Sequence, residues 1–161
     1  MNRFFLTRTL AIALVAGLAL IVAGLAQAHD YRRGGLIVTH PWTRPTSASR
    51  PIASVYLRIE NTNDQPDRLL AVTTPLTAKA ELHQTTEDGG VMRMRPVEAV
   101  EVPANSTITL QPGGIHLMLV NINRRLEDGD RFKLTLKFER AGEIIVDVLV
   151  QIPRADGKDM H

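Results

Sequence analysis

Ala53-Ser54-Val55-Tyr56-Leu57-Arg58-Ile59-Glu60 is the stretch that decides the fold, because apolar and polar side chains alternate along it. Val55, Leu57 and Ile59 share one face of an extended chain, and the residues between them face the other way. The cluster Asn61-Thr62-Asn63-Asp64 that follows is typical of a turn. The stretch therefore predicts a half-buried β-strand that ends in a turn.

Short strands of the same kind are predicted along the rest of the chain. Beyond residue 28 no segment shows a sustained apolar period of 3.6 residues, and turns rich in Gly, Pro and Asn divide the apolar runs. The predicted strands are 36–39, 53–60, 68–73, 79–83, 107–110, 115–121, 132–138 and 143–152. Short strands at this spacing predict one all-β domain, a β-sandwich or a Greek-key barrel.

The first 28 residues have the features of a secretory signal peptide. Arg3 and Arg8 precede an apolar run over 10–25, and Ala26-Gln27-Ala28 then offers a small-x-small cleavage site. An uncleaved anchor is the alternative, because a run of this length is near the short limit for a membrane span. We expect cleavage, export to the periplasm and no membrane association afterwards.

The remaining residues divide into a predicted flexible arm (29–35), a domain (36–153) and a flexible tail (154–161). Without the first 28 residues the chain carries 17 Lys and Arg against 17 Asp and Glu, because Arg3 and Arg8 are the charged residues removed from 19 and 17. No basic stripe survives, so we predict no nucleic-acid partner. The chain has no cysteine, which excludes disulfides, thiolate metal sites and thiol catalysis.

Four residues form the candidate metal site: His83, Met94, His116 and Met118. Two imidazoles and two thioethers are soft and uncharged, and such a set favours Cu(I) over Zn²⁺. Unlike a thiol, a thioether needs no deprotonation and cannot be lost to a disulfide. Because imidazole has an ordinary pKa of about 6.5, we also expect copper affinity to fall below about pH 6.

The spacing between His83 and Met94 is explained by a hairpin. Asp88-Gly89 is a strong signal for a two-residue type I′ loop, and pairing the flanking strands around it places His83 opposite Met94. Directly opposed residues share a face, with Cβ atoms about 5 Å apart. If Gly89-Gly90 were the loop instead, His83 would lie opposite Pro96.

His116 and Met118 are two residues apart on a predicted strand and therefore share a face. Ile115, Leu117 and Leu119 take the other face, which we expect to line the core. The histidines and thioethers should then face outward and form a shallow, accessible site. The sequence does not itself place this strand beside the hairpin.

At these residues the chain resembles the periplasmic copper chaperones of the PCu(A)C type. The spacing of the four candidate ligands matches the family signature, with Gln84 at the position of an optional methionine. The resemblance covers roughly 36–152 and includes the stretches 87–97 and 110–118. It implies a cupredoxin-like β-sandwich that binds one Cu(I) and delivers it to the Cu(A) centre of cytochrome c oxidase subunit II, alone or with a Sco-type thiol protein.

Other functions and ligands stay open. Storage or copper resistance without a specific acceptor is one alternative, and a metal-free scaffold is another. We expect no enzyme, since the chain has neither a Gly-rich phosphate loop nor a Gly-x-Ser-x-Gly motif, and the His₂Cys set of blue-copper proteins is missing. Further candidates for an assisting role are Met92, Glu81, His29 and the Met160-His161 tail.

Overall fold

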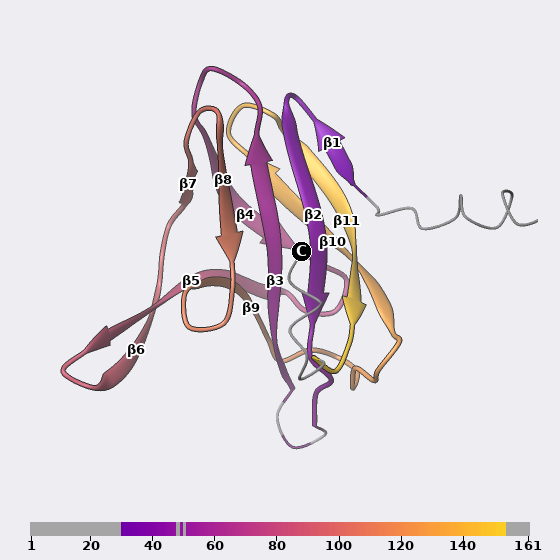
Figure 1. Ribbon diagram of the computed structural model, residues 1–161. Coiled ribbons are helices and arrows are strands. Elements are labelled where there is room, and N and C mark those ends of the chain that lie inside the picture. The colour runs from indigo at the N-terminus through magenta and orange to yellow at the C-terminus, as the bar shows by residue number, and fades with distance from the viewer. Residues whose placement is uncertain (1–29, 48, 50, 154–161) are drawn as a thin grey trace, which may run out of the picture.

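The structure, a computed structural model, describes residues 30–153 apart from 48 and 50 (Figure 1). Its strands are β1 (Tyr31–Arg33), β2 (Leu36–Thr43), β3 (Ile52–Asn61), β4 (Asp67–Thr73), β5 (Lys79–Asp88), β6 (Val91–Pro96), β7 (Val100–Val102), β8 (Ser106–Leu110), β9 (Ile115–Val120), β10 (Arg131–Phe138) and β11 (Glu143–Val150). The predicted signal peptide, His29 and the Met160-His161 tail lie outside the described residues. The prediction of an all-β chain is confirmed.

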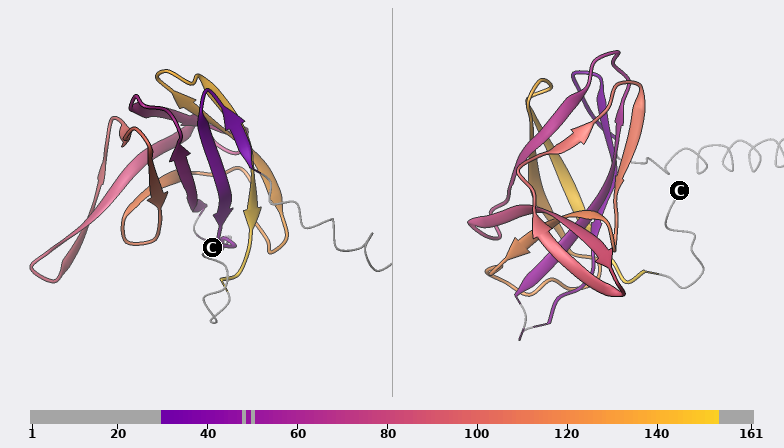
Figure 2. Two further views of the ribbon diagram at one scale, coloured as in Figure 1. Left: turned by 45° about the horizontal axis from the view of Figure 1, so that its top comes forward. Right: turned by 90° about the vertical axis from the view of Figure 1, so that its left-hand side faces the viewer.

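Hydrogen bonds join the strands in the order β6-β5-β9-β3-β2-β11-β10-β4-β7, with β1 beside β2 and β8 beside β3. The pair β11 and β2 is parallel, whereas β5 and its partners run antiparallel. β4 also contacts β5, and β7 contacts β3 and β8, so the sheet curls over and closes on itself as two layers (Figure 2). In the described part of the chain, no helix is long and apolar enough to span a membrane.

The core lies between the two layers and follows the predicted alternation. Val55, Leu57 and Ile59 of β3 are at most 2% exposed. The facing layer contributes alternate residues of β10 and β11 to the same cluster. Removing this apolar surface from water is the main driving force for the fold, at about 25 cal/mol per Å². The core therefore holds the sheet together without any disulfide.

β2 is longer than predicted. It continues from 39 to Thr43, and its register with β3 shifts between Thr39 and Trp42. His40 has a positive φ of 54°, which marks the bulge that accommodates Pro41 within the strand. The bulge brings Trp42 directly opposite Tyr56.

The segment 29–35, which we expected to be a flexible arm, contains β1 in its described part. Tyr31 to Arg33 pair with β2, and the Tyr31 hydroxyl accepts a hydrogen bond from the Asp147 backbone N–H at 2.9 Å. The loop is Gly34-Gly35, with φ of 55° and 76°. Both glycines take the positive φ that a tight hairpin loop needs, so the polar composition concealed a hairpin signal.

Replacing Ile59 by Ala should lower the free energy of unfolding by about 2–5 kcal/mol, because Ile59 is fully buried and the loss leaves a cavity. The matched control is Glu60→Ala, which removes an exposed neighbour and should change stability by less than about 0.5 kcal/mol. Urea denaturation followed by circular dichroism measures both. Equal effects for the two variants would contradict the assignment of faces on β3.

Candidate metal centre

The hairpin that carries Met94 has a different loop from the predicted one. Asp88 pairs with Val91, so Gly89-Gly90 is the loop, and the prediction of Asp88-Gly89 is wrong. Both loop residues have positive φ, 59° and 81°. Glycine takes this conformation without steric cost, so Gly-Gly suits a type I′ loop as well as Asp-Gly does.

The new register changes the partner of His83 but keeps its face. His83 lies opposite Pro96, and Met94 lies opposite Thr85, two pairs closer to the tip. Because the shift is by two residues, His83 and Met94 stay on the same face and become diagonal neighbours. Diagonal Cβ atoms are about 7–8 Å apart, which is within reach of a long side chain such as methionine.

The strand that carries the second histidine lies directly beside the hairpin. β5 pairs with β9, and in this register His83 is opposite His116. The two imidazole centroids are 6.0 Å apart with an angle of 42° between the rings. A metal–nitrogen distance of about 2 Å on each side, plus the radius of each ring, spans a separation of this size.

Each imidazole has one nitrogen engaged and one free. The Nδ1–H of His116 donates to the Gly114 carbonyl oxygen at 3.0 Å, and the Nε2–H of His83 donates to Oε2 of Glu81 at 3.0 Å. The remaining atoms, Nδ1 of His83 and Nε2 of His116, are buried and have no hydrogen-bond partner in the protein. A neutral imidazole that donates through one nitrogen has a lone pair on the other, so these two atoms are the ones that can bind a metal.

Glu81 is in the position of a carboxylate that orients a metal-binding histidine. The hydrogen bond with His83 lowers the pKa of the Glu81 carboxyl, and the charge of Lys79 adds to this effect. The carboxyl is therefore ionised at neutral pH and fixes which His83 nitrogen carries the proton. Glu81 has only a weak signal in the sequence, namely its place two residues before His83 on the same face.

The two thioethers flank the histidine pair from opposite sides along the strands. Met118 lies opposite Glu81 on β5 and opposite Ser54 on β3, in the row next to the pair. Met94 lies in the row on the other side, towards the hairpin tip. All four predicted ligands thus share one face of the sheet, on the neighbouring strands β5, β6 and β9.

The site is less open than predicted. His83 is 9% exposed and His116 is 3% exposed, whereas Met94 is 48% exposed. Alternation correctly predicts that His116 faces away from Leu117, but it does not show what lies beside the ring. The centre therefore has a buried nitrogen half and an exposed sulfur edge.

A row of aromatic side chains runs from the histidines across the sheet. Tyr56 lies 6.4 Å from His116, and Trp42 lies 4.8 Å from Tyr56, measured between ring centroids. These rings cover the flank of His116 that faces β3 and contribute to its burial. Tyr56 was identifiable from the alternation in β3, but Trp42 joins the row only because of the bulge in β2.

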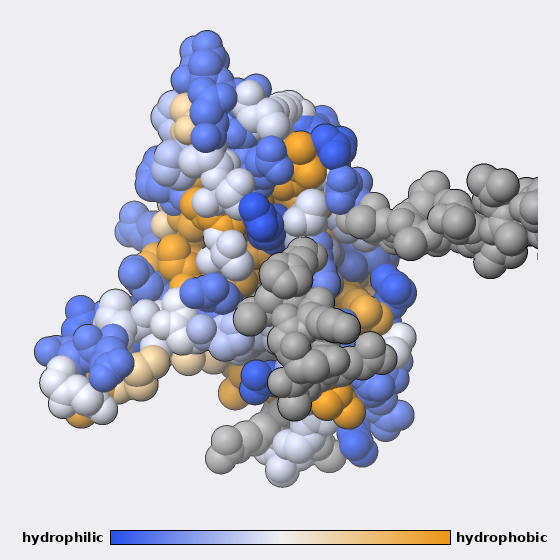
Figure 3. All heavy atoms as spheres, in the orientation of Figure 1, coloured by the Kyte–Doolittle hydropathy of each residue, from blue (hydrophilic) through white to orange (hydrophobic). Residues whose placement is uncertain are grey.

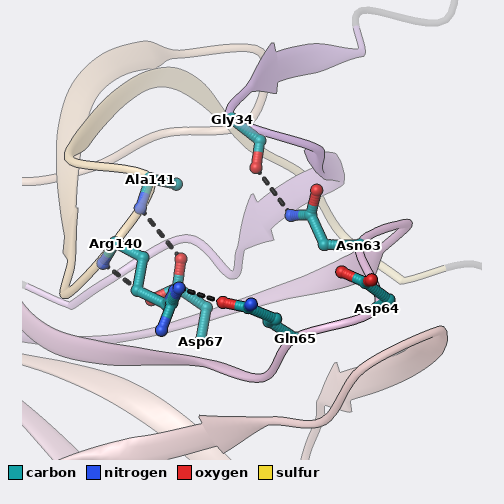
Figure 4. A pocket seen from close by; sticks show the side chains of 7 residues that line it. All are labelled: Gly34, Asn63, Asp64, Gln65, Asp67, Arg140 and Ala141. Atoms are coloured by element: carbon teal, nitrogen blue, oxygen red, sulfur yellow. Dashed lines mark hydrogen bonds between the residues drawn. The ribbon is translucent and has the colours of Figure 1, made fainter.

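Away from the histidines, a hollow of about 210 Å³ lies at the end of the sandwich near the β1–β2, β3–β4 and β10–β11 turns (Figure 4). Its central carboxylate, Asp67, accepts hydrogen bonds from the backbone N–H groups of Arg68, Arg140 and Ala141. These bonds satisfy Asp67 and hold the β10–β11 turn. The hollow therefore has a structural explanation.

Within the described ranges 30–47, 49 and 51–153, no group of three His, Cys, Asp or Glu side chains is arranged to hold a metal ion. The histidine pair is accompanied by sulfur instead. A donor set of two free imidazole nitrogens and two neighbouring thioethers fits a soft ion of low charge.

A comparison with known protein families and with curated proteins finds relatives of this chain. The family model described as "Putative lipoprotein LpqE-like" matches residues 36–150. The "Putative lipoprotein Lxx21020" of Leifsonia xyli subsp. xyli is 28% identical over 125 residues, which are 77% of this chain and 74% of that protein. The "Uncharacterized protein RP573" of Rickettsia prowazekii is 30% identical over 114 residues, 68% of this chain and 63% of that one.

Similar solved structures include domains that are named PCuAC. The apo PCuAC domain from PmoF1 is 34% identical with a TM-score of 0.67, over 78% of this chain and 100% of that domain. The copper-bound PCuAC domain from PmoF2 is 31% identical with a TM-score of 0.67, over 78% and 99%. The solution structure of Cu(I)-DR1885 from Deinococcus radiodurans is 29% identical with a TM-score of 0.59, over 81% and 85%.

The family match spans most of the chain, and the structural matches extend along nearly the whole described domain. They confirm both the predicted fold class and the resemblance noted from the ligand spacing. The chain belongs to the LpqE-like family, and its domain is a cupredoxin-like β-sandwich of the PCuAC type.

Proposed function

We propose that the protein is an exported metallochaperone that binds one Cu(I) through His83, Met94, His116 and Met118. The observation that carries this proposal is the pair of buried imidazole nitrogens without hydrogen-bond partners on the neighbouring strands β5 and β9. A methionine lies on either side of this pair along the strands. A buried polar atom without a partner costs about 1–3 kcal/mol. A metal bound between the two rings would remove that cost.

The choice of Cu(I) follows from charge and softness. The four donors are neutral, so a monovalent ion keeps one net charge in a partly buried site, whereas Zn²⁺ would keep two. Thioether sulfur binds soft ions and is a poor ligand for hard divalent ones. The structures similar to this chain include a copper-bound PCuAC domain and the Cu(I) form of DR1885, which supports the same choice.

A carrier must both hold the ion and release it. The histidine half of the centre is shielded and oriented by Glu81 and the Gly114 carbonyl, which favours retention. The Met94 edge is half exposed, which lets an incoming ligand approach. Binding and release of this kind involve no covalent change in a substrate, so we propose a carrier and not an enzyme.

We further propose that the carrier acts in the periplasm and delivers copper to the Cu(A) centre of cytochrome c oxidase subunit II, with a Sco-type thiol protein as a partner. The signal-peptide pattern and the match to a family described as lipoprotein-like support export. The PCuAC likeness supports the copper cargo. Storage or resistance without a specific acceptor is the alternative.

Competition with a chromogenic Cu(I) chelator tests the site directly. The wild-type protein should take one equivalent of Cu(I) and should not lose it to excess Zn²⁺. The His116→Ala and Met118→Leu variants should each bind more than about 100-fold more weakly, because losing a ligand should cost more than the 10- to 100-fold that loss of a supporting residue typically costs.

The matched control is Gln84→Ala, which alters the neighbour of His83 on the opposite face and should retain wild-type affinity. A folded His116→Ala protein that binds Cu(I) as tightly as the wild type does would remove the proposed site. Binding of Zn²⁺ in preference to Cu(I) would contradict the assignment of the ion.

Glu81→Gln should weaken Cu(I) binding by about 10- to 100-fold, because the amide keeps the size of Glu81 but loses the charge that orients His83. Glu87→Gln is the control, as it neutralises another carboxylate on the same face of β5 at the exposed end. The same chelator competition measures both variants. If they behave alike, Glu81 acts only through general charge.

A deletion strain distinguishes delivery from storage. Grown at low copper, it should lose cytochrome c oxidase activity, and added copper or the wild-type gene should restore the activity while the His116→Ala gene should not. Normal oxidase activity together with reduced copper tolerance would favour the storage alternative.

A further inference from the structure

The β5–β6 hairpin projects beyond the packed body of the domain (Figure 3), and its outer strand is exposed along its whole length. Met92 is 56% exposed and Met94 is 48% exposed. Neither side chain belongs to the core cluster or packs against it. Packing against the core therefore does not account for two methionines at this position.

The two methionines lie on the metal-binding face. Met92 is opposite Glu87, Met94 is opposite Thr85, and Pro96 is opposite His83, so all three β6 residues face the same way as His83. Two residues along a strand cover about 6.6 Å. Because methionine has three rotatable side-chain bonds, sulfur atoms attached this far apart can approach one ion.

The opposite face of β6 has a different composition. Val91, Arg93 and Arg95 lie there, and charged residues of this kind protect an edge strand from pairing with other chains. The metal-binding face of β6 carries only Met92, Met94 and Pro96, with no charged side chain. β6 thus contributes soft neutral donors to this face of the hairpin, and β5 contributes the carboxylate of Glu87 opposite Met92.

We propose that Met92 and Met94 form a second, outer site for Cu(I), a two-thioether transfer position between the buried histidines and the hairpin tip. The inference rests on the proposed Cu(I) function. Transfer is a ligand substitution: a Cu–S bond to Met92 forms as a bond to an inner ligand breaks, and Met94 stays bound throughout. The ion remains Cu(I), and thioether sulfur neither takes up nor releases a proton.

In this arrangement Met94 belongs to both sites, whereas Met92 belongs only to the outer one. Met92 should then contribute little to the equilibrium affinity, because the four-ligand inner site is preferred. It should affect the rate at which copper leaves, because the outer site is the position from which an incoming ligand takes the ion.

Stopped-flow transfer of Cu(I) from the loaded protein to a chromogenic chelator tests the proposal. Met92→Leu keeps an apolar side chain of similar size but removes the sulfur. It should leave the dissociation constant unchanged within about twofold, and it should slow the transfer several-fold. Val91→Ala alters an exposed apolar residue on the opposite face of the same strand; it is the control and should change neither quantity.

Methyl NMR of methionine-labelled protein provides the second measurement. The first equivalent of Cu(I) should shift the Met94 and Met118 methyl signals of the wild-type protein. In His116→Ala, where the inner site has lost a ligand, excess Cu(I) or Ag(I) should shift the signals of Met92 and Met94. Transfer at the wild-type rate in Met92→Leu, or a Met92 signal unmoved by excess ion, would overturn the outer site. A loss of equilibrium affinity as large as that of Met118→Leu would make Met92 an inner ligand and also overturn it.

Failure of the proposed function gives a different result. If the wild-type protein takes up no Cu(I), then Met94 and Met118 do not respond to the first equivalent. If those two respond and Met92 does not, then the copper site stands and only the outer site is lost.

Discussion

The pairing of β5 with β9 is the constraint on which the centre depends. His83 is 33 positions before His116 in the sequence, and only the hydrogen-bonded register of these strands places one imidazole opposite the other. Their alternate residues Leu82, Leu117 and Leu119 are buried in the core. Because a shift by one residue would turn these leucines to the outside, the core fixes the register and thereby positions the histidines.

The fold was predictable because it depends on local alternation. The pattern in 53–60 identified β3 and its buried face, and the turn residues identified most strand boundaries. Two hairpin loops were harder to predict. The polar composition around Gly34-Gly35 concealed the first, and at the second the competing pair Asp88-Gly89 was preferred to Gly89-Gly90. Which of two overlapping dipeptides forms a turn depends on strand pairing, which a local pattern does not contain.

The candidate site was predictable as a set of residues but only partly as a geometry. Strand parity placed Met94 and His83 on one face, and this conclusion survived the corrected register because the shift was by two residues. The burial of His116 was not predictable, since it comes from Tyr56 on a neighbouring strand and from His83 itself. Contacts between strands far apart in the sequence decide how accessible an outward-facing side chain is.

The loop at the end of the β5–β6 hairpin touches nothing else in the described molecule: a Cβ added at Gly89 or Gly90 would meet no atom within 4 Å. Insertions at such exposed loops cost little, because they disturb no buried contact. The length of the hairpin is therefore free to vary while the histidines stay anchored in the sandwich. Evolution or design can therefore change how far the hairpin extends from the domain without disturbing the arrangement of the two imidazoles.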